Sequence, residues 1–220
     1  MTRPTLLVVA KAPVPGLAKT RIAAQVGDDV AAELAAAALL DTLETVQAAG
    51  AELGAPVVVA ITGDVAAAAR SAEIAAVLAT VDVVQQRGDG FAERLVHAHA
   101  DADRGHGVVQ VGMDTPQLTT DDYADAVRAV IRGERVVGPA DDGGWWLLGL
   151  PDAAEARVLA SVPMSAPDTG ERTVAALSPI TSLRTVLDMD EWADAQHIAA
   201  AAPSSRLAAV VQALAERVTS

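Results

Sequence analysis

The 220-residue chain contains no cysteine, which excludes disulfide bridges, thiolate metal sites and thiol nucleophiles. Aromatic residues make up only 2% of the sequence, so we expect a core built mainly from alanine, valine and leucine. No apolar run approaches the roughly 18 residues of a membrane span, and the N-terminus lacks the long apolar region of a signal peptide. We therefore expect a cytoplasmic protein with no membrane partner, and the length fits a single domain over residues 1–220.

Positive charge is also scarce. The formal net charge is −13 and the sequence pI is about 4.5, which argues against DNA or another nucleic acid as a partner. Of the sixteen cationic side chains only two are lysines, Lys11 and Lys19. Residues 1–27 contain no aspartate or glutamate, although Arg3 and Arg21 also fall there. This positive island in an acidic protein predicts a site for one small anion.

Apolar, β-branched runs alternate with helical patterns along the chain. Such alternation predicts an α/β fold in which a mostly parallel sheet is covered by helices on both faces. The third run is the most polar and is expected near an edge of the sheet. The runs that we expect to be strands are 5–10, 56–61, 81–86, 107–112, 135–140 and 145–150. The expected helical segments are 28–49, 65–78, 88–102 and 121–132, and an amphipathic helix over about 204–218 within the tail 204–220.

Parallel sheets bind ligands beyond the carboxyl ends of their strands. Three unusual stretches follow expected strands here: "KAPVPGLAKTR" the first, "MDTP" the fourth and "DDGG" the fifth. We therefore expect three separate loops to converge on one cleft.

The loop "KAPVPGLAKTR" (residues 11–21) combines two prolines with Gly16, which allows a close approach of the backbone to a ligand. Lys19, Thr20 and Arg21 stand where the loop enters a helix, so free N–H groups and cationic side chains could face one anion. The spacing is not that of a Walker A loop. The alternative is a solvated loop with surface cations.

The candidate metal ligands are aspartates. Asp114 ends an apolar strand, where a carboxylate suits Mg²⁺ or Mn²⁺ shared with substrate phosphates; alternatively, it caps a turn. The stretch "LRTVLDMD" is expected to be a strand that ends in Asp188 and Asp190, either of which could complete a metal site with Asp114. Asp190 could instead be the N-cap of the helix that follows.

The stretch "DDGGWW" places Asp142 before Gly143 and Gly144, and then two indoles at the start of a strand. Because neighbouring strand residues point to opposite faces, one of Trp145 and Trp146 is expected in the core, while the other could stack on a sugar or base. The alternative for the glycines is a simple hairpin turn.

In their order, the stretches "KAPVPGLAKTR", "GDGFAERL", "VGMDTPQLT", "GPADDGGWWLLGL" and "LDMD" resemble a bacterial family of glycosyltransferase-like proteins, some of them named for arsenosugar biosynthesis. That family is similar to 2-phospho-L-lactate guanylyltransferase. The resemblance runs from about Thr5 to Asp190 and implies a Rossmann-like GT-A fold of the nucleotide-diphospho-sugar transferase superfamily.

The resemblance also implies roles for individual residues. The nucleotide phosphates would be held by residues of the first loop and by one arginine of "GDGFAERL": Lys11, Gly16, Lys19, Thr20, Arg21 and Arg94. Asp114 and Asp190 would be the metal ligands. Asp142 and Lys19 would be catalytic, and Gly143, Gly144, Trp145 and Trp146 would shape the acceptor pocket.

Three functions remain open at the level of the sequence. The first is metal-dependent glycosyl transfer from a nucleotide-diphospho-sugar to a small-molecule acceptor. The second is nucleotidyl transfer from an NTP to a phosphorylated small acceptor with release of pyrophosphate, which the cationic loop favours because a triphosphate carries more charge. The third is a non-catalytic nucleotide-binding protein. The alanine- and leucine-rich helices could also carry a homo-oligomer interface.

Overall fold

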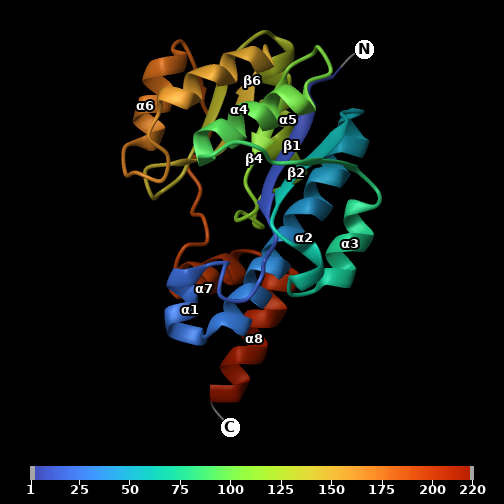
Figure 1. Cartoon of the computed structure of the whole chain (residues 1–220), viewed down its shortest axis with the longest axis vertical. Coiled ribbons are helices and arrows are strands. Elements are labelled where there is room, and N and C mark those ends of the chain that lie inside the picture. Colours follow the sequence, from blue (N-terminus) through green and yellow to red (C-terminus); the bar gives the residue numbers. More distant parts are fainter. Residues whose placement is uncertain (1–2, 219–220) are drawn as a thin grey trace.

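The computed structural model describes residues 3–218, which form an α/β structure around one seven-stranded sheet. The strand order is β3-β2-β1-β4-β6-β5-β7 (Figure 1). All neighbouring pairs are parallel except those of β6, which runs antiparallel to both β4 and β5. The strands are β1 (Thr5–Lys11), β2 (Val57–Thr62), β3 (Asp82–Gln85), β4 (Val108–Val111), β5 (Val136–Pro139), β6 (Trp145–Leu150) and β7 (Thr181–Ser182).

Helices cover both faces of the sheet. One face packs against α2 (Asp28–Leu53), α3 (Ser71–Leu78) and α5 (Thr120–Ile131), through a core that includes Leu39, Leu43 and Tyr123. The other face packs against α4 (Phe91–Ala102), the 3₁₀ segment η2 (Ala153–Ser161) and α6 (Thr169–Leu177). A shorter 3₁₀ turn, η1 (Val65–Ala67), precedes α3.

Three further helices gather at one end of the molecule, beside the start of α2 (Figure 1). They are α1 (Thr20–Val26), α7 (Trp192–Ala201) and α8 (Arg206–Val218). The buried Asp41 of α2 fastens the start of α8, because its carboxylate accepts hydrogen bonds from the backbone N–H groups of Arg206 and Leu207, each at 3.0 Å. The side chain of Arg206 adds an ion pair to the same carboxylate at 3.0 Å.

Six of the seven strands expected from the sequence are present, and β3 lies at an edge as predicted. The helix expected to end at residue 49 continues to Leu53, where Gly54 closes it with φ +64°. The short strand β7 was not predicted. The tail helix begins at Arg206 rather than Ser204 and is described to Val218, and residues 219–220 of the predicted segment lie outside the described residues.

The prediction of a strand that ends in Asp188 and Asp190 is wrong. In this segment only Val186 forms a single parallel bridge, with Ala140, and the chain then runs on without strand pairing to α7. The residues that follow carry side chains into the cleft described below instead of pairing with β5. The N-cap of α7 is also not Asp190 but Glu191, which forms a capping box with Asp194.

Within residues 3–218, no single helix combines the length and the apolar character needed to cross a bilayer. The helices α7 and α8 meet that criterion of length and composition only when taken together across a bend of 119°.

Candidate functional site

A cleft with a volume of about 710 Å³ lies at the edge of the sheet where β1, β2 and β4 end. The three stretches singled out in the sequence all contribute to its lining: the β1–α1 loop, the residues after β4, and the turn between β5 and β6. The chain before α7 adds a fourth wall through Asp188 and Asp190. The expectation that separate loops converge on one cleft therefore agrees with the geometry.

The β1–α1 loop contributes Lys11, Lys19, Thr20 and Arg21 to the cleft. Lys19 is the N-cap of α1 and adopts the left-handed conformation with φ 47°, a region that non-glycine residues rarely occupy. Such conformations are often found at functional sites. The Lys11 ammonium donates to the carbonyl oxygen of Leu17 at 2.7 Å, while Gly16, with φ +76°, is exposed and does not line the cleft.

The positive and negative charges of the cleft meet directly. The Lys19 ammonium lies 2.8 Å from Asp114 Oδ2 and 3.5 Å from Asp190 Oδ1, and its side chain is 12% exposed. Arg21 pairs with Asp190 Oδ2 at 3.0 Å from a more exposed position. Burial alone would lower the pKa of Lys19, but the charges of Asp114 and Asp190 outweigh it and raise this pKa above its ordinary value. Lys19 is therefore a fixed cation at neutral pH.

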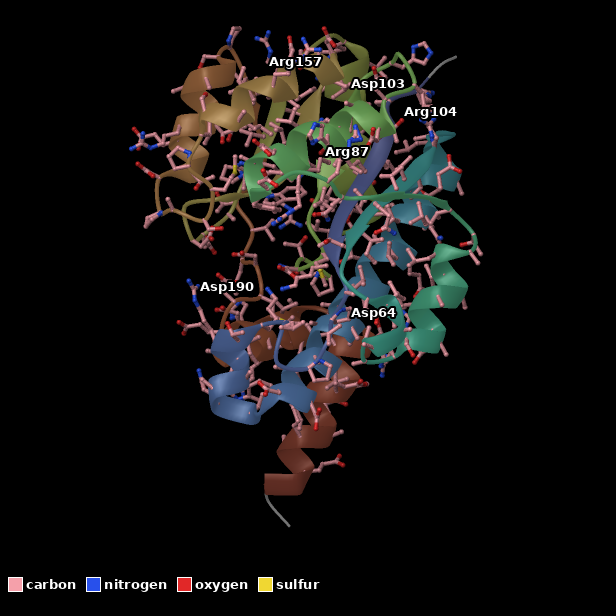
Figure 2. The ribbon with its side chains drawn as sticks, viewed as in Figure 1. Asp64, Arg87, Asp103, Arg104, Arg157 and Asp190 are labelled. Atoms are coloured by element: carbon pink, nitrogen blue, oxygen red, sulfur yellow. The ribbon has the colours of Figure 1, made fainter. Side chains whose placement is uncertain are left out.

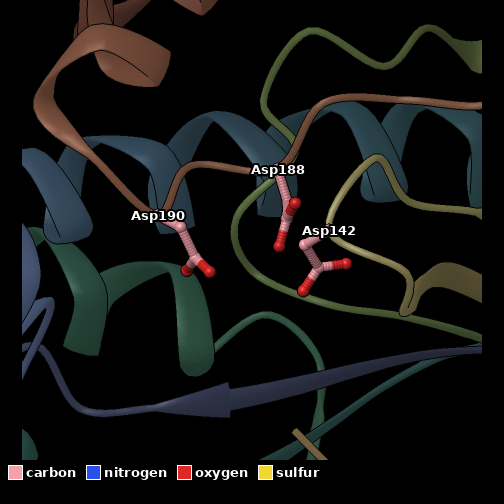
Figure 3. A group of neighbouring side chains, drawn as sticks. All are labelled: Asp142, Asp188 and Asp190. Atoms are coloured by element: carbon pink, nitrogen blue, oxygen red, sulfur yellow. The ribbon is translucent and has the colours of Figure 1, made fainter. Parts of the chain in front are cut away.

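Three carboxylates, those of Asp142, Asp188 and Asp190, approach one another across the cleft, with one oxygen of each within 4.8 Å of the others (Figure 3). Burial, together with the charges of Asp142 and Asp190, raises the pKa of Asp188 to about 6. A cation placed among these groups would relieve their mutual repulsion.

Asp114 stands outside this group of three carboxylates, on the other side of Lys19. Its second oxygen, Oδ1, is buried and has no hydrogen-bond partner among the residues described. An orphaned carboxylate oxygen is unusual, because buried polar atoms are nearly always paired. Since all the available donors are carboxylate oxygens, the residues present fit Mg²⁺ or Mn²⁺ better than a softer metal.

The turn between β5 and β6 is both a tight turn and a wall of the cleft. The Asp142 carboxylate accepts a hydrogen bond from the backbone N–H of Gly144 at 2.7 Å, as in an Asx-type turn. Gly143 has φ +87°, and a Cβ at this position would lie 1.9 Å from the carbonyl oxygen of Pro167. Gly143 is therefore required for close packing and does not line the cleft, whereas Gly144 does.

The two indoles have different environments, as expected. Trp146 is buried, packs over Gly138, and donates its Nε1–H to the carbonyl oxygen of Arg184 at 3.1 Å. Trp145 packs on the α4 side of the sheet and lines the cleft. Its Nε1 is buried without a partner among the described residues.

Arg94, in the first turn of α4, also lines the cleft. Its guanidinium lies over the ring of Phe91, with Cζ 5.7 Å from the ring centre, and its Nε is buried without a partner. Phe91 itself is 44% exposed.

Two glutamines of the cleft were not recognised in the sequence. Gln110 lies within the buried strand β4, and its Oε1 is 2.9 Å from Nε2 of the fully buried His99. Gln86 follows β3, and its side-chain amide donates to the carbonyl oxygens of Ala10 and Ala60. The signal that could have revealed Gln110 is a polar residue inside the otherwise apolar run "VVQV".

Comparison with known proteins agrees with this architecture. Residues 42–166, more than half of the chain, match the family described as "Uncharacterized protein conserved in bacteria (DUF2064)". No curated protein matches the chain. A crystal structure from Desulfovibrio desulfuricans G20, provisionally assigned as a nucleotide-diphospho-sugar transferase, is 27% identical with a TM-score of 0.75, and the match covers 87% of this chain and 84% of that one.

More distant structures share the fold alone. The manganese complex of Rv0371c from Mycobacterium tuberculosis H37Rv is 21% identical with a TM-score of 0.53, over 90% of this chain and 98% of that one. The CTP complex of CMP:2-keto-3-deoxy-manno-octonic acid synthetase is 12% identical with a TM-score of 0.51, over the same shares of the two chains. The fold is thus that of nucleotide-diphospho-sugar transferases, as the resemblance implied.

Proposed function

The chain belongs to the DUF2064 family and has the fold of nucleotide-diphospho-sugar transferases, and from these premises we propose that it is a nucleotide-dependent transferase. In this proposal the enzyme acts in the cytoplasm and transfers a glycosyl group from a nucleotide-diphospho-sugar to a small-molecule acceptor. The observation that carries the proposal is the direct contact between the cationic β1–α1 loop and the carboxylates after β4 and before α7. Lys19 bridges Asp114 and Asp190 at 2.8 and 3.5 Å.

We propose that Lys11, Lys19, Thr20 and Arg21 bind the phosphates of the donor. All four line the cleft, and Thr20 and Arg21 are the first residues of α1, where unpaired backbone N–H groups add to the attraction for an anion. Lys19 and Arg21 would then stabilise the negative charge that develops on the diphosphate as it leaves. In the free protein these two cations are paired with carboxylates. A bound phosphate would replace those carboxylates as the partner of the two cations.

A divalent ion, Mg²⁺ or Mn²⁺, would be held by Asp190 together with Asp114 or with the neighbouring Asp142 and Asp188. When bound, it would neutralise phosphate charge. The orphaned Oδ1 of Asp114 and the all-oxygen donor set support this proposal, and the manganese complex of Rv0371c supports it at the level of a shared fold.

Asp142 is the proposed general base. Its Oδ1 is held by the Gly144 N–H, and its Oδ2 has no hydrogen-bond partner among the described residues. The acceptor hydroxyl would attack the anomeric carbon, the bond from that carbon to the diphosphate oxygen would break, and the hydroxyl proton would pass to Asp142. Gly144 and Trp145 beside it would shape the acceptor side of the cleft.

Nucleotidyl transfer is the second candidate, because three cations on one loop suit the larger charge of a triphosphate. A thermal-shift screen of UDP- and GDP-sugars against GTP and CTP, with and without Mg²⁺, ranks the two candidates by the donor that stabilises the protein most. Release of pyrophosphate from an NTP in the presence of phosphorylated acids would support nucleotidyl transfer. Binding without turnover of any donor would instead indicate a non-catalytic protein.

The metal assignment has its own test. We expect Asp114→Asn to remove the Mg²⁺-dependent part of nucleotide binding while leaving the fold intact, because Asp114 lies in the cleft and not in the core. Asp125→Asn, which removes an exposed carboxylate paired with Arg128 on α5, is the matched control and should bind as the wild type does. Unchanged Mg²⁺ dependence in the Asp114 variant would show that the assignment is wrong.

A further inference from the structure

Three hydrogen-bond donors on the α4 side of the cleft have no acceptor among residues 3–218. They belong to Arg94, Trp145 and Gln110, which all line the cleft. The Nε of Arg94 and the Nε1 of Trp145 are buried and unpaired. Arg94 also has no carboxylate partner in the described part of the chain, unlike Lys19 and Arg21 across the cleft. Buried donors are almost always satisfied, so the unpaired Nε of Arg94 and Nε1 of Trp145 indicate a ligand that supplies the missing acceptors.

The orientation of Gln110 follows from its contact with His99. Burial lowers the pKa of His99 to about 4, so the ring is neutral at neutral pH and carries one N–H. Nδ1 has no partner, whereas Nε2 lies 2.9 Å from Oε1 of Gln110. A proton on Nε2 leaves no buried N–H of the ring unpaired, and Gln110 Oε1 accepts it. The NH₂ group of Gln110 is therefore the end of the side chain that remains free to donate.

The three donors share one face and one edge of the sheet. Arg94 stands in the first turn of α4, which covers the face formed by Leu7 and Val9. Trp145 packs against the same cluster at the start of β6, and Gln110 is the third residue of the adjacent β4. Each donor therefore reaches the cleft from the same side.

The carboxylates of the cleft come from other segments. Asp114 follows β4, Asp142 lies in the turn between β5 and β6, and Asp188 and Asp190 precede α7. No aspartate or glutamate of α4 or of the strands β4 and β6 lines the cleft within the described residues. The wall formed by Arg94, Trp145 and Gln110, called here the donor wall, is thus a cationic and donor-rich surface that carries none of the carboxylates of the cleft.

We propose that the donor wall binds an anionic oxygen group, a carboxylate or a phosphate, carried by the acceptor substrate. The proposal rests on the transferase function proposed above, and it reassigns Arg94 from the nucleotide phosphates to the acceptor. A guanidinium group recognises both anions through paired hydrogen bonds, and an indole N–H and an amide NH₂ add neutral donors to the remaining oxygens. In this proposal the phosphates of the nucleotide sugar are bound separately, by Lys11, Lys19 and Arg21 on the β1–α1 loop.

Gln86 adds a complementary group to the lining of the same cleft. Both hydrogens of its amide are used by the carbonyl oxygens of Ala10 and Ala60, at 2.7 and 2.8 Å, so its Oε1 is left as an acceptor. Because Gln86 lines the same cleft, a small molecule that carries a hydroxyl near its anionic group could donate to Gln86 Oε1 and accept from the donor wall. The inferred acceptor class is therefore a hydroxylated carboxylic acid or a phosphorylated alcohol.

The indole N–H of Trp145 is a built-in probe for this proposal. In a ¹H–¹⁵N NMR spectrum the indoles of Trp145, Trp146 and Trp192 give separate signals, and Trp145→Phe identifies one of them. We expect sodium phosphate or sodium acetate, titrated at constant ionic strength and millimolar concentration, to shift the Trp145 signal saturably. The Trp146 signal should not follow, because its N–H already donates to Arg184.

Arg94→Gln should weaken the anion response of Trp145 by about tenfold or more, since it removes a charged donor. Arg104→Gln makes the same change of charge just beyond α4, where Arg104 pairs with Asp82 at 3.2 Å far from Asp190 (Figure 2). We expect this control to respond as the wild type does. Unchanged Trp146 and Trp192 signals in both variants would establish that they are folded.

The result that would overturn the donor wall is a Trp145 signal that moves with neither anion, or one that moves equally in the Arg94 and Arg104 variants. The transferase proposal is tested separately by nucleotide binding. An Arg94-dependent response without any nucleotide binding would support the anion site and contradict the transferase proposal. Nucleotide binding together with a Trp145 signal that does not respond to anions would contradict only the donor-wall proposal.

Discussion

Lys19→Met tests whether Lys19 competes with a divalent ion for the same carboxylates. Methionine is similar in size to lysine but carries no charge, so the variant leaves Asp114 and Asp190 without the ammonium that now lies 2.8 and 3.5 Å away. We expect the variant to bind Mn²⁺ more tightly than the wild type in the absence of nucleotide, and to bind nucleotide more weakly. These opposite changes distinguish the substitution from simple damage to the cleft.

The magnitude follows from Coulomb's law. A single and a double positive charge about 5 Å apart repel by about 1.7 kcal/mol at the dielectric constant of water and by about 6.6 kcal/mol at an effective value of about 20. Because the cleft is open and Asp190 is 34% exposed, we take the lower figure as the guide. It predicts Mn²⁺ binding that is at least about tenfold tighter. Without metal, the variant should be less stable, because breaking a largely buried ion pair leaves unpaired carboxylates.

The assay is Mn²⁺ titration followed by electron paramagnetic resonance of the free ion, with thermal unfolding in parallel. The loss of stability in Lys19→Met should be restored as Mn²⁺ is added, since a ligand of the folded state stabilises it in proportion to the logarithm of its concentration. Lys11→Met is the matched control, because the Lys11 ammonium contacts the Leu17 carbonyl and no carboxylate. Equal Mn²⁺ affinity in the wild type and both variants would refute the idea that the ion and Lys19 share ligands.

Three further predictions concern stability. Gly143→Ala should lower the free energy of unfolding in urea by about 3 kcal/mol, because at φ +87° the added Cβ would lie 1.9 Å from a backbone oxygen. The control Gly105→Ala has a similar φ of +80° but nothing within 4 Å of its Cβ, so it should lower this free energy by only about 1 kcal/mol. Equal losses in the two variants would contradict the packing argument. Burial lowers the pKa of His99 to about 4 from 6.5, so the unfolded chain binds this proton first as pH falls. Between pH 7 and 4 the wild type should therefore lose about 3 kcal/mol more than His99→Gln, and parallel pH profiles would show that His99 does not titrate this way. Asp41→Ala should cost about 3 kcal/mol and expose the residues before α8 to proteolysis, because it leaves the start of α8 uncapped; intact resistance to protease would mean that α8 is held by apolar packing alone.

Much of the fold could be predicted because its strands are continuous apolar runs that are buried on both faces. The runs that became β1, β2 and β4 are almost wholly buried, and β3, the most polar run, lies at the edge as its composition indicated. The two-residue strand β7 carries no periodic pattern, so no sequence rule reveals it. The apolar residues of "LRTVLDMD" resemble a strand, yet only Val186 is bridged, because this segment leaves the sheet to reach α7.

The site was predictable to the extent that its residues stand at strand ends. Lys19 and Asp114 meet because the segments that follow β1 and β4 leave the same edge of the sheet, and this rule needs no coordinates. Asp190 reaches them from the unpaired segment before α7, which the rule does not cover. The donor wall could not be predicted, since it depends on which side-chain donors lack partners. That property emerges only when α4 packs against β4 and places His99 against Gln110.

The reversal of β6 brings two differently connected parts of the sheet to one cleft. A parallel connection at this position would have required a helical crossover, whereas the antiparallel one needs only the turn that holds Asp142 and Gly144. The parallel half of the sheet carries the lysine- and arginine-bearing loop, and the reversed strand carries Trp145. In the proposed reaction, substitution of Trp145 on the reversed strand would change which molecule receives the transferred group without altering the residues proposed to hold the phosphates, so that acceptor preference can diverge within a single scaffold.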